Sequence, residues 1–249
     1  MKKNFNKTPH FIFGLNNSIE IFKSNKINIQ SIHLLKDGLA IKNKSMKFYL
    51  DDHKKICRIY DKNKFKKIFP SMRTQGIVIK FNFSLINQLP KFKNDNTCLL
   101  LPESIEDPQN LGQIIRTSEC AGIDGMLISK NRSVGLTNTV LQVSQGAFLN
   151  LPLYNIGNIN QTLNTLKKEG FWIIGVENSI DAVDWFDIDY KGKVVLVFGS
   201  EGKGIREKTI KNCDSLVTIP MLGSINSLNV SATVSAILFE RNRQLQHNK

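Results

Sequence analysis

The chain has 249 residues, of which 41% are hydrophobic, and it carries a formal net charge of +13. This length allows one large domain or two modest ones. No run of about 18 apolar residues occurs, so we expect no membrane span, and no apolar segment follows the basic start, so we expect no signal peptide. The sequence therefore predicts a cytoplasmic protein.

The four cysteines are far apart in the sequence and none forms a Cys-x-x-Cys pair. They are Cys57, Cys98, Cys120 and Cys213. This spacing offers no metal-binding or redox motif, and we expect reduced, buried thiols.

The positive charge lies entirely in the N-terminal part of the chain. Residues 1–96 hold 20 Lys and Arg against 6 Asp and Glu, a net of +14, whereas residues 97–249 hold 14 against 15, a net of −1. A general preference for lysine in the source organism would raise both parts alike. The asymmetry favours a basic module that contacts nucleic acid, joined to a catalytic module.

Residues 1–90 predict a small α/β domain that binds the RNA substrate. A short helix is expected within residues 10–24, and residues 48–67 show near-helical spacing. Strands are expected at 31–35 and 75–83. The polar segment 91–96, which follows Pro90, is the expected linker.

Residues 97–249 predict strands and helices in alternation. Continuous apolar strands separated by helices are typical of a parallel sheet covered on both faces, so the predicted class is α/β. The expected strands are 98–101, 125–128, a short one around Tyr154, 171–176, 193–198 and 216–219. The expected helices are 107–120, with Asp107 as its cap and Pro108 in its first turn, then 138–148, 161–169 and 228–244.

A glycine-rich turn follows the strand that ends at Phe198. Residues 198–205 read Phe-Gly-Ser-Glu-Gly-Lys-Gly-Ile, and the glycines allow a sharp turn and a close approach to a ligand. The segment is not a phosphate-binding P-loop, because Ile205 stands where that motif requires lysine. Nor does it match the dinucleotide pattern Gly-x-Gly-x-x-Gly. A purely structural turn is the alternative.

Two further polar segments flank predicted helices. Residues 110–116 read Asn-Leu-Gly-Gln-Ile-Ile-Arg, and residues 227–231 read Ser-Leu-Asn-Val-Ser. Asn110 and Asn229 fall in first helical turns, where an amide can cap the helix or contact a ligand. Arg116 lies off the apolar face of its helix, and an ordinary surface arginine is the alternative.

These three segments, in this order, resemble the motifs of the SpoU/TrmH family of RNA ribose 2′-O-methyltransferases, within the SPOUT class. The resemblance covers residues 97–245. The N-terminal part is similar to that of the large-subunit rRNA guanosine 2′-O-methyltransferases, although Asn16 and Thr74 stand where those proteins usually have histidine. The resemblance implies a C-terminal trefoil knot, a homodimer, no metal and S-adenosylmethionine as cofactor.

The resemblance also implies roles for individual residues. Arg116, Asn110, Glu201 and Asn229 would be catalytic, with Ser227 and Ser231 as secondary candidates. The cofactor would lie against Gly199, Gly202, Ile219 and Leu228, and its adenine in a slot formed by Leu196, Ile219, Met221 and Leu228.

The chemistry of Arg116 has two readings. The resemblance assigns it the role of proton acceptor, yet a guanidinium group is essentially always protonated. Alternatively, Arg116 holds a phosphate and stabilises the developing alkoxide.

The substrate and the function also have alternatives. Large-subunit rRNA is the expected substrate, and tRNA is the second candidate. The third possibility is a non-catalytic RNA-binding or ribosome-assembly protein.

Overall fold

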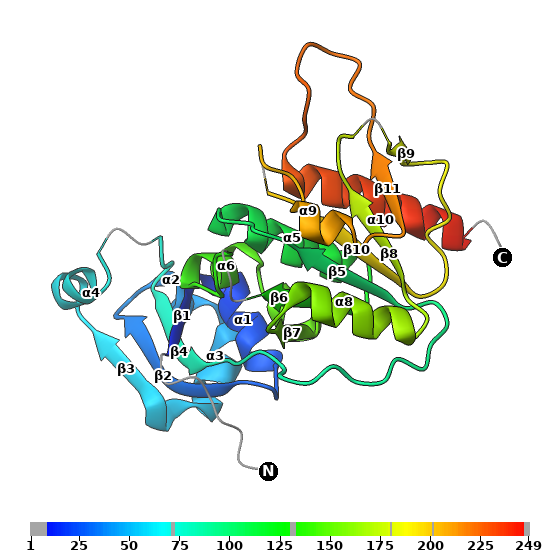
Figure 1. Cartoon of the computed structure of the whole chain (residues 1–249). Coiled ribbons are helices and arrows are strands. Elements are labelled where there is room, and N and C mark those ends of the chain that lie inside the picture. Colours follow the sequence, from blue (N-terminus) through cyan, green and yellow to red (C-terminus); the bar gives the residue numbers. More distant parts are fainter. Residues whose placement is uncertain (1–8, 71–72, 130–132, 180, 201, 247–249) are drawn as a thin grey trace. The chain divides into compact units, whose positions relative to one another are not determined.

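A computed structural model describes residues 9–70, 73–129, 133–179, 181–200 and 202–246. The chain divides into two compact units (Figure 1). Unit 1 comprises Met1–Ser84 and Thr137–Leu149, and unit 2 comprises Leu85–Leu136 and Asn150–Lys249. The expected linker 91–96 thus lies within unit 2, and a segment from the middle of the chain belongs to unit 1. None of the described helices is long and apolar enough to cross a membrane.

Unit 1 contains a four-stranded mixed sheet in the order β1-β4-β2-β3. Its strands are β1 His10–Phe13, β2 Asn28–Leu35, β3 Cys57–Tyr60 and β4 Ile77–Asn82. β2 and β3 are parallel, whereas β4 runs antiparallel to both β1 and β2. The predicted strand 31–35 is confirmed as part of β2, and the predicted strand 75–83 contains β4.

The helices of unit 1 are short. They are α1 Leu15–Lys23, α2 Leu39–Lys42, α3 Lys44–Asp52, the 3-10 turn Lys54–Ile56, α4 Lys62–Ile68, α6 Asn138–Val143 and α7 Ala147–Asn150. The near-helical interpretation of residues 48–67 is wrong, because strand β3 interrupts it. After β3 a new helix, α4, begins. Its N-cap is Asp61, whose carboxylate accepts a hydrogen bond from the backbone N–H of Lys64 at 2.9 Å.

Segment 137–149 belongs to unit 1 because its amide side chains form hydrogen bonds with the backbone groups at the free edge of β1. The Oδ1 atom of Asn138 accepts a hydrogen bond from the backbone N–H of Phe11 at 3.0 Å. Gln142 accepts one from Phe13 N–H at 3.0 Å and donates one back to Phe13 C=O at 2.9 Å. An uncovered edge strand would expose these groups and invite aggregation.

Unit 2 contains a parallel seven-stranded sheet in the order β7-β6-β5-β10-β8-β11-β9. Its strands are β5 Cys98–Pro102, β6 Gly125–Ser129, β7 Leu153–Ile156, β8 Trp172–Val176, β9 Val183–Asp184, β10 Val194–Phe198 and β11 Ser215–Thr218. Its helices are α5 Pro108–Cys120, α8 Ile159–Lys168, α9 Glu207–Ile210 and α10 Val230–Gln246. The parallel α/β prediction is confirmed, while the short elements β9 and α9 were not anticipated.

Helices cover both faces of this sheet (Figure 1). Leu163 and Leu166 of α8 pack with Leu99, Val195 and Val197, residues of β5 and β10 that point to the same face. α5 and α10 contact each other and cover the opposite face. β10, buried throughout, lies at the centre between β5 and β8.

Two of the four cysteines are poor nucleophiles. Burial raises the pKa of the Cys98 thiol, and likewise that of Cys213, to about 12. Cys120 is exposed on α5, so the expectation of buried thiols is wrong for this residue.

The predicted helix 138–148 breaks into α6 and α7 at residues 144–146. Gln145 and Gly146 both have positive φ, at 50° and 90°. A Cβ atom on Gly146 would lie 2.7 Å from the Cβ of Glu20. Only glycine fits this turn without displacing α1.

We expect Gly146→Ala to lower the free energy of unfolding by about 1 to 3 kcal/mol, because it adds backbone strain and a steric overlap. Urea unfolding followed by circular dichroism measures this change. Gln145→Gly, the matched control, should cost less than about 1 kcal/mol, since glycine adopts positive φ freely. Equal stability of the two variants would contradict this account of the turn.

Candidate functional site

A cavity of about 530 Å³ opens at the carboxyl ends of β8, β10 and β11. Parallel sheets commonly bind ligands at this edge, where the loops after neighbouring strands converge. Its walls are the segments that follow these three strands and the beginning of α10. The lining residues are Val176–Asn178, Phe198–Ser200, Gly202, Gly204, Thr218, Ile219, Met221, Asn226–Val230 and Thr233.

Five of the six residues predicted to bind the cofactor line this cavity. They are Gly199, Gly202, Ile219, Met221 and Leu228. Leu196 does not line it: the residue is fully buried inside β10, two positions before the strand ends. Leu196 therefore contributes nothing to the wall of this cavity.

The loop after β10 is closed on itself. Ser200 N–H donates to Gly204 C=O at 3.2 Å, and Gly204 N–H donates to Ser200 C=O at 2.9 Å. A Cβ atom on Gly199 would overlap the backbone of Gly204 and Ile205. Glycine is therefore required at position 199, because this residue packs closely against the backbone at the end of the loop. Glu201, one of the predicted catalytic residues, lies outside the described residues.

A second cavity of about 220 Å³ adjoins the first. It is lined by Ser104–Asp107, Asn110, Ser200, Lys203 and Val230. Ser200 and Val230 belong to the walls of both cavities. The predicted catalytic residues Asn110 and Asn229 thus lie on neighbouring cavities.

Asn110 and Asn229 contact each other directly. The amide of Asn229 donates to Oδ1 of Asn110 at 3.0 Å, and its own Oδ1 accepts from the hydroxyl and the N–H of Ser231 at 2.6 and 2.9 Å. The hydroxyl of Ser231 also lies 2.8 Å from Oε1 of Gln113. This network joins the first turn of α5 to the start of α10 and fixes both asparagine side chains.

Arg116 is exposed on α5, on the same side of the helix as Gln113. It lines neither cavity. The structure therefore brings Asn110 and Asn229 together, and places Arg116 two turns along the helix from Asn110, facing outward. The prediction that Arg116 points away from the apolar face is confirmed.

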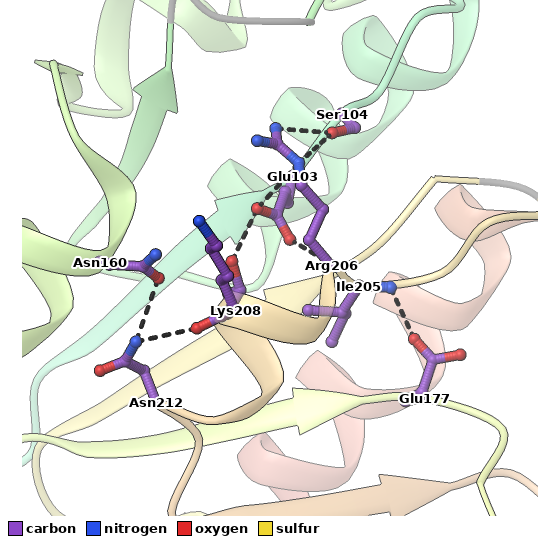
Figure 2. A network of polar contacts seen from close by, with 9 residues as sticks. Glu103, Ser104, Asn160, Glu177, Ile205, Arg206, Lys208 and Asn212 are labelled. Carbon is purple, nitrogen blue, oxygen red and sulfur yellow. Dashed lines mark hydrogen bonds and ion pairs between the residues drawn. The ribbon is translucent and has the colours of Figure 1, made fainter.

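A buried carboxylate, which the sequence analysis did not identify, holds the far end of the loop (Figure 2). Glu103 follows β5 and is only 1% exposed. It accepts hydrogen bonds from Arg206 N–H at 3.0 Å and from the Thr209 hydroxyl at 2.8 Å, and it forms an ion pair with the Arg206 guanidinium at 3.4 Å. The same guanidinium donates to the Ser104 hydroxyl, at 2.9 Å from Nη2.

A second carboxylate holds the loop from β8. Glu177 accepts a 2.6 Å hydrogen bond from Ile205 N–H and lines the larger cavity (Figure 2). Glu103 and Glu177 thus hold successive residues, 206 and 205, from two different strands. A signal was available in the sequence, since each acid comes directly after the apolar run of a predicted strand.

Among the described residues, no three His, Cys, Asp or Glu side chains gather in a way that could hold a metal ion.

Comparisons with known proteins agree with this architecture. Residues 97–239 match the SpoU rRNA Methylase family. The 23S rRNA (guanosine-2′-O-)-methyltransferase RlmB of Shewanella oneidensis is 40% identical over 179 residues, 70% of this chain and 72% of that protein. A putative TrmH family tRNA/rRNA methyltransferase of Staphylococcus aureus is 34% identical over 194 residues, 76% of this chain and 78% of that protein.

Among solved structures, the SpoU methyltransferase AviRb of Streptomyces viridochromogenes, in complex with AdoMet, superposes with a TM-score of 0.81. The two are 18% identical, and the alignment covers 96% of this chain and 91% of AviRb. The fold is therefore that of the SpoU methyltransferases. On the sequence matches, the chain belongs to the SpoU rRNA methylase family and is a methyltransferase, as the resemblance implied.

Glu103→Ala should lower the free energy of unfolding by about 2 to 4 kcal/mol, because it leaves a buried N–H, a buried hydroxyl and a guanidinium without their acceptor. Urea unfolding measures the loss. Glu207→Ala is the control: its carboxylate is 82% exposed and pairs with Lys211 on the same helix, so its loss should cost less than about 0.5 kcal/mol. A Glu103 variant as stable as the control would refute the anchoring role.

Gly199→Ala should weaken binding at the larger cavity at least about tenfold, because the loop must open to admit the methyl group. Isothermal titration with S-adenosylmethionine measures this. Gly135→Ala is the control, since a Cβ atom there meets nothing within 4 Å. Unchanged affinity in Gly199→Ala would show that the loop stem does not shape the cavity.

Proposed function

We propose that this protein transfers a methyl group from S-adenosylmethionine to the ribose 2′-hydroxyl of a guanosine in 23S rRNA. Its family membership and its similarity to a 23S rRNA (guanosine-2′-O-)-methyltransferase support this assignment. The single structural observation that carries it is the Asn110–Asn229 pair between two adjoining cavities at the carboxyl edge of a parallel sheet.

The larger cavity suits S-adenosylmethionine. Its volume is in the range of small-molecule sites, about 300 to 1,000 Å³. Ile219, Met221 and Leu228 offer an apolar wall for the adenine, while the loop at Gly199 and Gly202 presents backbone groups. The structure of AviRb with AdoMet is consistent with this choice. When bound, the cofactor supplies an electrophilic methyl group on a sulfonium.

The smaller cavity holds the target ribose in this proposal. Ser200 and Val230 belong to both cavities, so a hydroxyl there lies next to the cofactor site. Asn110 and Asn229 orient that ribose, and because their amides are already held by each other and by Ser231, they need little further ordering. Most of the rate gain then comes from holding the reacting atoms in line.

Arg116 binds a phosphate of the RNA next to the target nucleotide. Because Arg116 lies outside both cavities, it acts by holding this phosphate and so placing the ribose, and the proton of the 2′-hydroxyl is released to water as the methyl group transfers. Its exposed position on α5 leaves it accessible to a polyanion. Glu201 completes the set of catalytic candidates, with Ser227 lining the larger cavity.

Two features of the SPOUT class belong to the proposal. A trefoil knot near the C-terminus is supported by the strand order, in which β10 lies between β5 and β8, and by the packing of α10 on α5. A homodimer is supported by exposed apolar side chains, Leu222, Ile225 and Phe239. Light scattering should return about twice the chain mass of 28.2 kDa; the single mass would rule out the dimer.

The function is tested with tritiated S-adenosylmethionine and total RNA that lacks 2′-O-methyl groups. Label at a guanosine of 23S rRNA would support the proposal. Label in the tRNA fraction would instead assign the protein to tRNA modification, in line with its similarity to the putative TrmH family tRNA/rRNA methyltransferase of Staphylococcus aureus. If the protein neither labels RNA nor binds the cofactor, the result would favour a non-catalytic RNA-binding protein.

Arg116→Ala should reduce kcat at least about 100-fold, because the target ribose loses the phosphate contact that holds it in line for the attack. The dissociation constant for S-adenosylmethionine, measured by calorimetry, should change less than about twofold. Arg116→Lys is the matched variant and should recover only part of the rate, since an ammonium keeps the charge but not the planar fork. Unchanged turnover in Arg116→Ala would exclude a catalytic role.

A further inference from the structure

Unit 1 carries a pocket of about 500 Å³ on one face of its own sheet. Each of the four strands and α4 contribute to it. The lining residues are Phe11, Gln30, Ser31, His33, Arg58, Ile68, Phe69 and Lys80. No step of the proposed methyl transfer uses this pocket.

The strand register places the key side chains on the same face. Phe11 and Ser31 both pair with Lys80, and His33 pairs with Arg58. Directly paired residues point to the same side of a sheet. α4 covers only part of this face, where Phe65 and Phe69 pack on Val78. The remainder of the face is left open with cationic and aromatic groups at its surface.

The pocket floor is rigid. The His33 ring lies 2.9 Å from the Ser31 hydroxyl and 3.1 Å from the Tyr60 hydroxyl, so both ring nitrogens are engaged. The ring stacks on Tyr60, with centroids 5.7 Å apart. Burial, followed by the charges of Arg58 and Lys80, lowers the pKa of His33. His33 is therefore a neutral, fixed part of the floor at pH 7.

The rim of the pocket is cationic. Within the part of the chain that the structure describes, neither Arg58 nor Lys80 forms an ion pair with an acidic side chain. Lys80 instead lies over the Phe11 ring, 5.8 Å from its centroid. α4, which borders the pocket, adds four exposed lysines: Lys62, Lys64, Lys66 and Lys67. This concentration of positive charge attracts anionic partners.

We propose that this pocket binds one nucleotide of the RNA substrate, with its phosphate on Arg58 and Lys80 and its base against Phe11 and Ile68. An aromatic and apolar wall beside paired cations suits a single-stranded nucleotide, because its base is unstacked and its phosphate is adjacent. An acidic peptide would use the cations but not the flat apolar wall. The inference rests on the proposed function, since it takes RNA as the substrate.

The test uses the full-length protein and an unmethylated 23S rRNA transcript. Arg58→Gln with Lys80→Gln should weaken RNA binding at least about tenfold near 0.15 M salt. It should also reduce the slope of log affinity against log salt by about 0.7, the value for one single-strand phosphate contact. The matched control is Lys44→Gln with Lys47→Gln, which removes the same charge from exposed positions of α3 outside the pocket. The control should weaken binding less than about threefold.

Phe11→Leu separates base stacking from charge. Leucine retains apolar volume but removes the aromatic face, so RNA affinity should fall about fivefold or more with an unchanged salt slope. S-adenosylmethionine affinity should stay at the wild-type value in all these variants, which checks that unit 2 is intact.

The outcomes separate the two proposals. If the wild-type protein methylates 23S rRNA but the pocket and control pairs lose affinity equally, the pocket assignment is overturned and the methyltransferase assignment stands. If the pocket pair binds RNA as tightly as the wild type, the pocket serves another partner and the assignment also fails. If the wild type transfers no methyl group to any RNA, the proposed function fails independently of the pocket.

Discussion

The candidate site depends on two buried or half-buried carboxylates that restrain one loop. Glu103, after β5, and Glu177, after β8, hold residues 206 and 205 from opposite sides of β10. A glycine-rich loop has a large conformational entropy to lose on folding, and the backbone hydrogen bonds between Ser200 and Gly204 alone fix only its tip. Because the carboxylates fix its far end, the loop can present its backbone to a ligand with little further ordering. Both cavities share Ser200, so both depend on this restraint.

The sequence predicted the order of elements in unit 2 well because each of its main strands is a continuous apolar run and each long helix has a recognisable start. α5 begins at the Asp107 cap, and its side chain accepts from Gln109 N–H at 2.9 Å as expected. Five of the six residues predicted to bind the cofactor line one cavity, because they follow strands whose carboxyl ends meet. Leu196 was misplaced because apolar composition does not distinguish a residue inside a central strand from one at its end.

The remaining features could not be predicted because they arise from contacts between distant segments. Glu103 and Arg206 are 103 residues apart, and a lone glutamate after a strand gives no indication of its partner. Strand β3 has four residues, too few for the period-two pattern to stand out from the lysine-rich sequence around it. The glycine at the break between α6 and α7 is required by its contact with Glu20, more than 120 positions earlier in the chain. Local patterning carries no information about such partners.

Unit 1 includes residues 137–149 as well as the N-terminal residues. This determines how its contribution to RNA binding can be measured separately from unit 2. Phe148 is 1% exposed and packs against Phe81 and Phe83, with ring centroids 6.1 and 5.1 Å apart. Removal of residues 1–90 would therefore expose Phe148 and leave the amides of Asn138 and Gln142 without β1. Loss of RNA binding in such a truncation could reflect misfolding or aggregation of the exposed segment. Exposed charges such as Arg58 can be changed without disturbing that packing, so point variants isolate the contribution of unit 1 to RNA binding and a deletion does not.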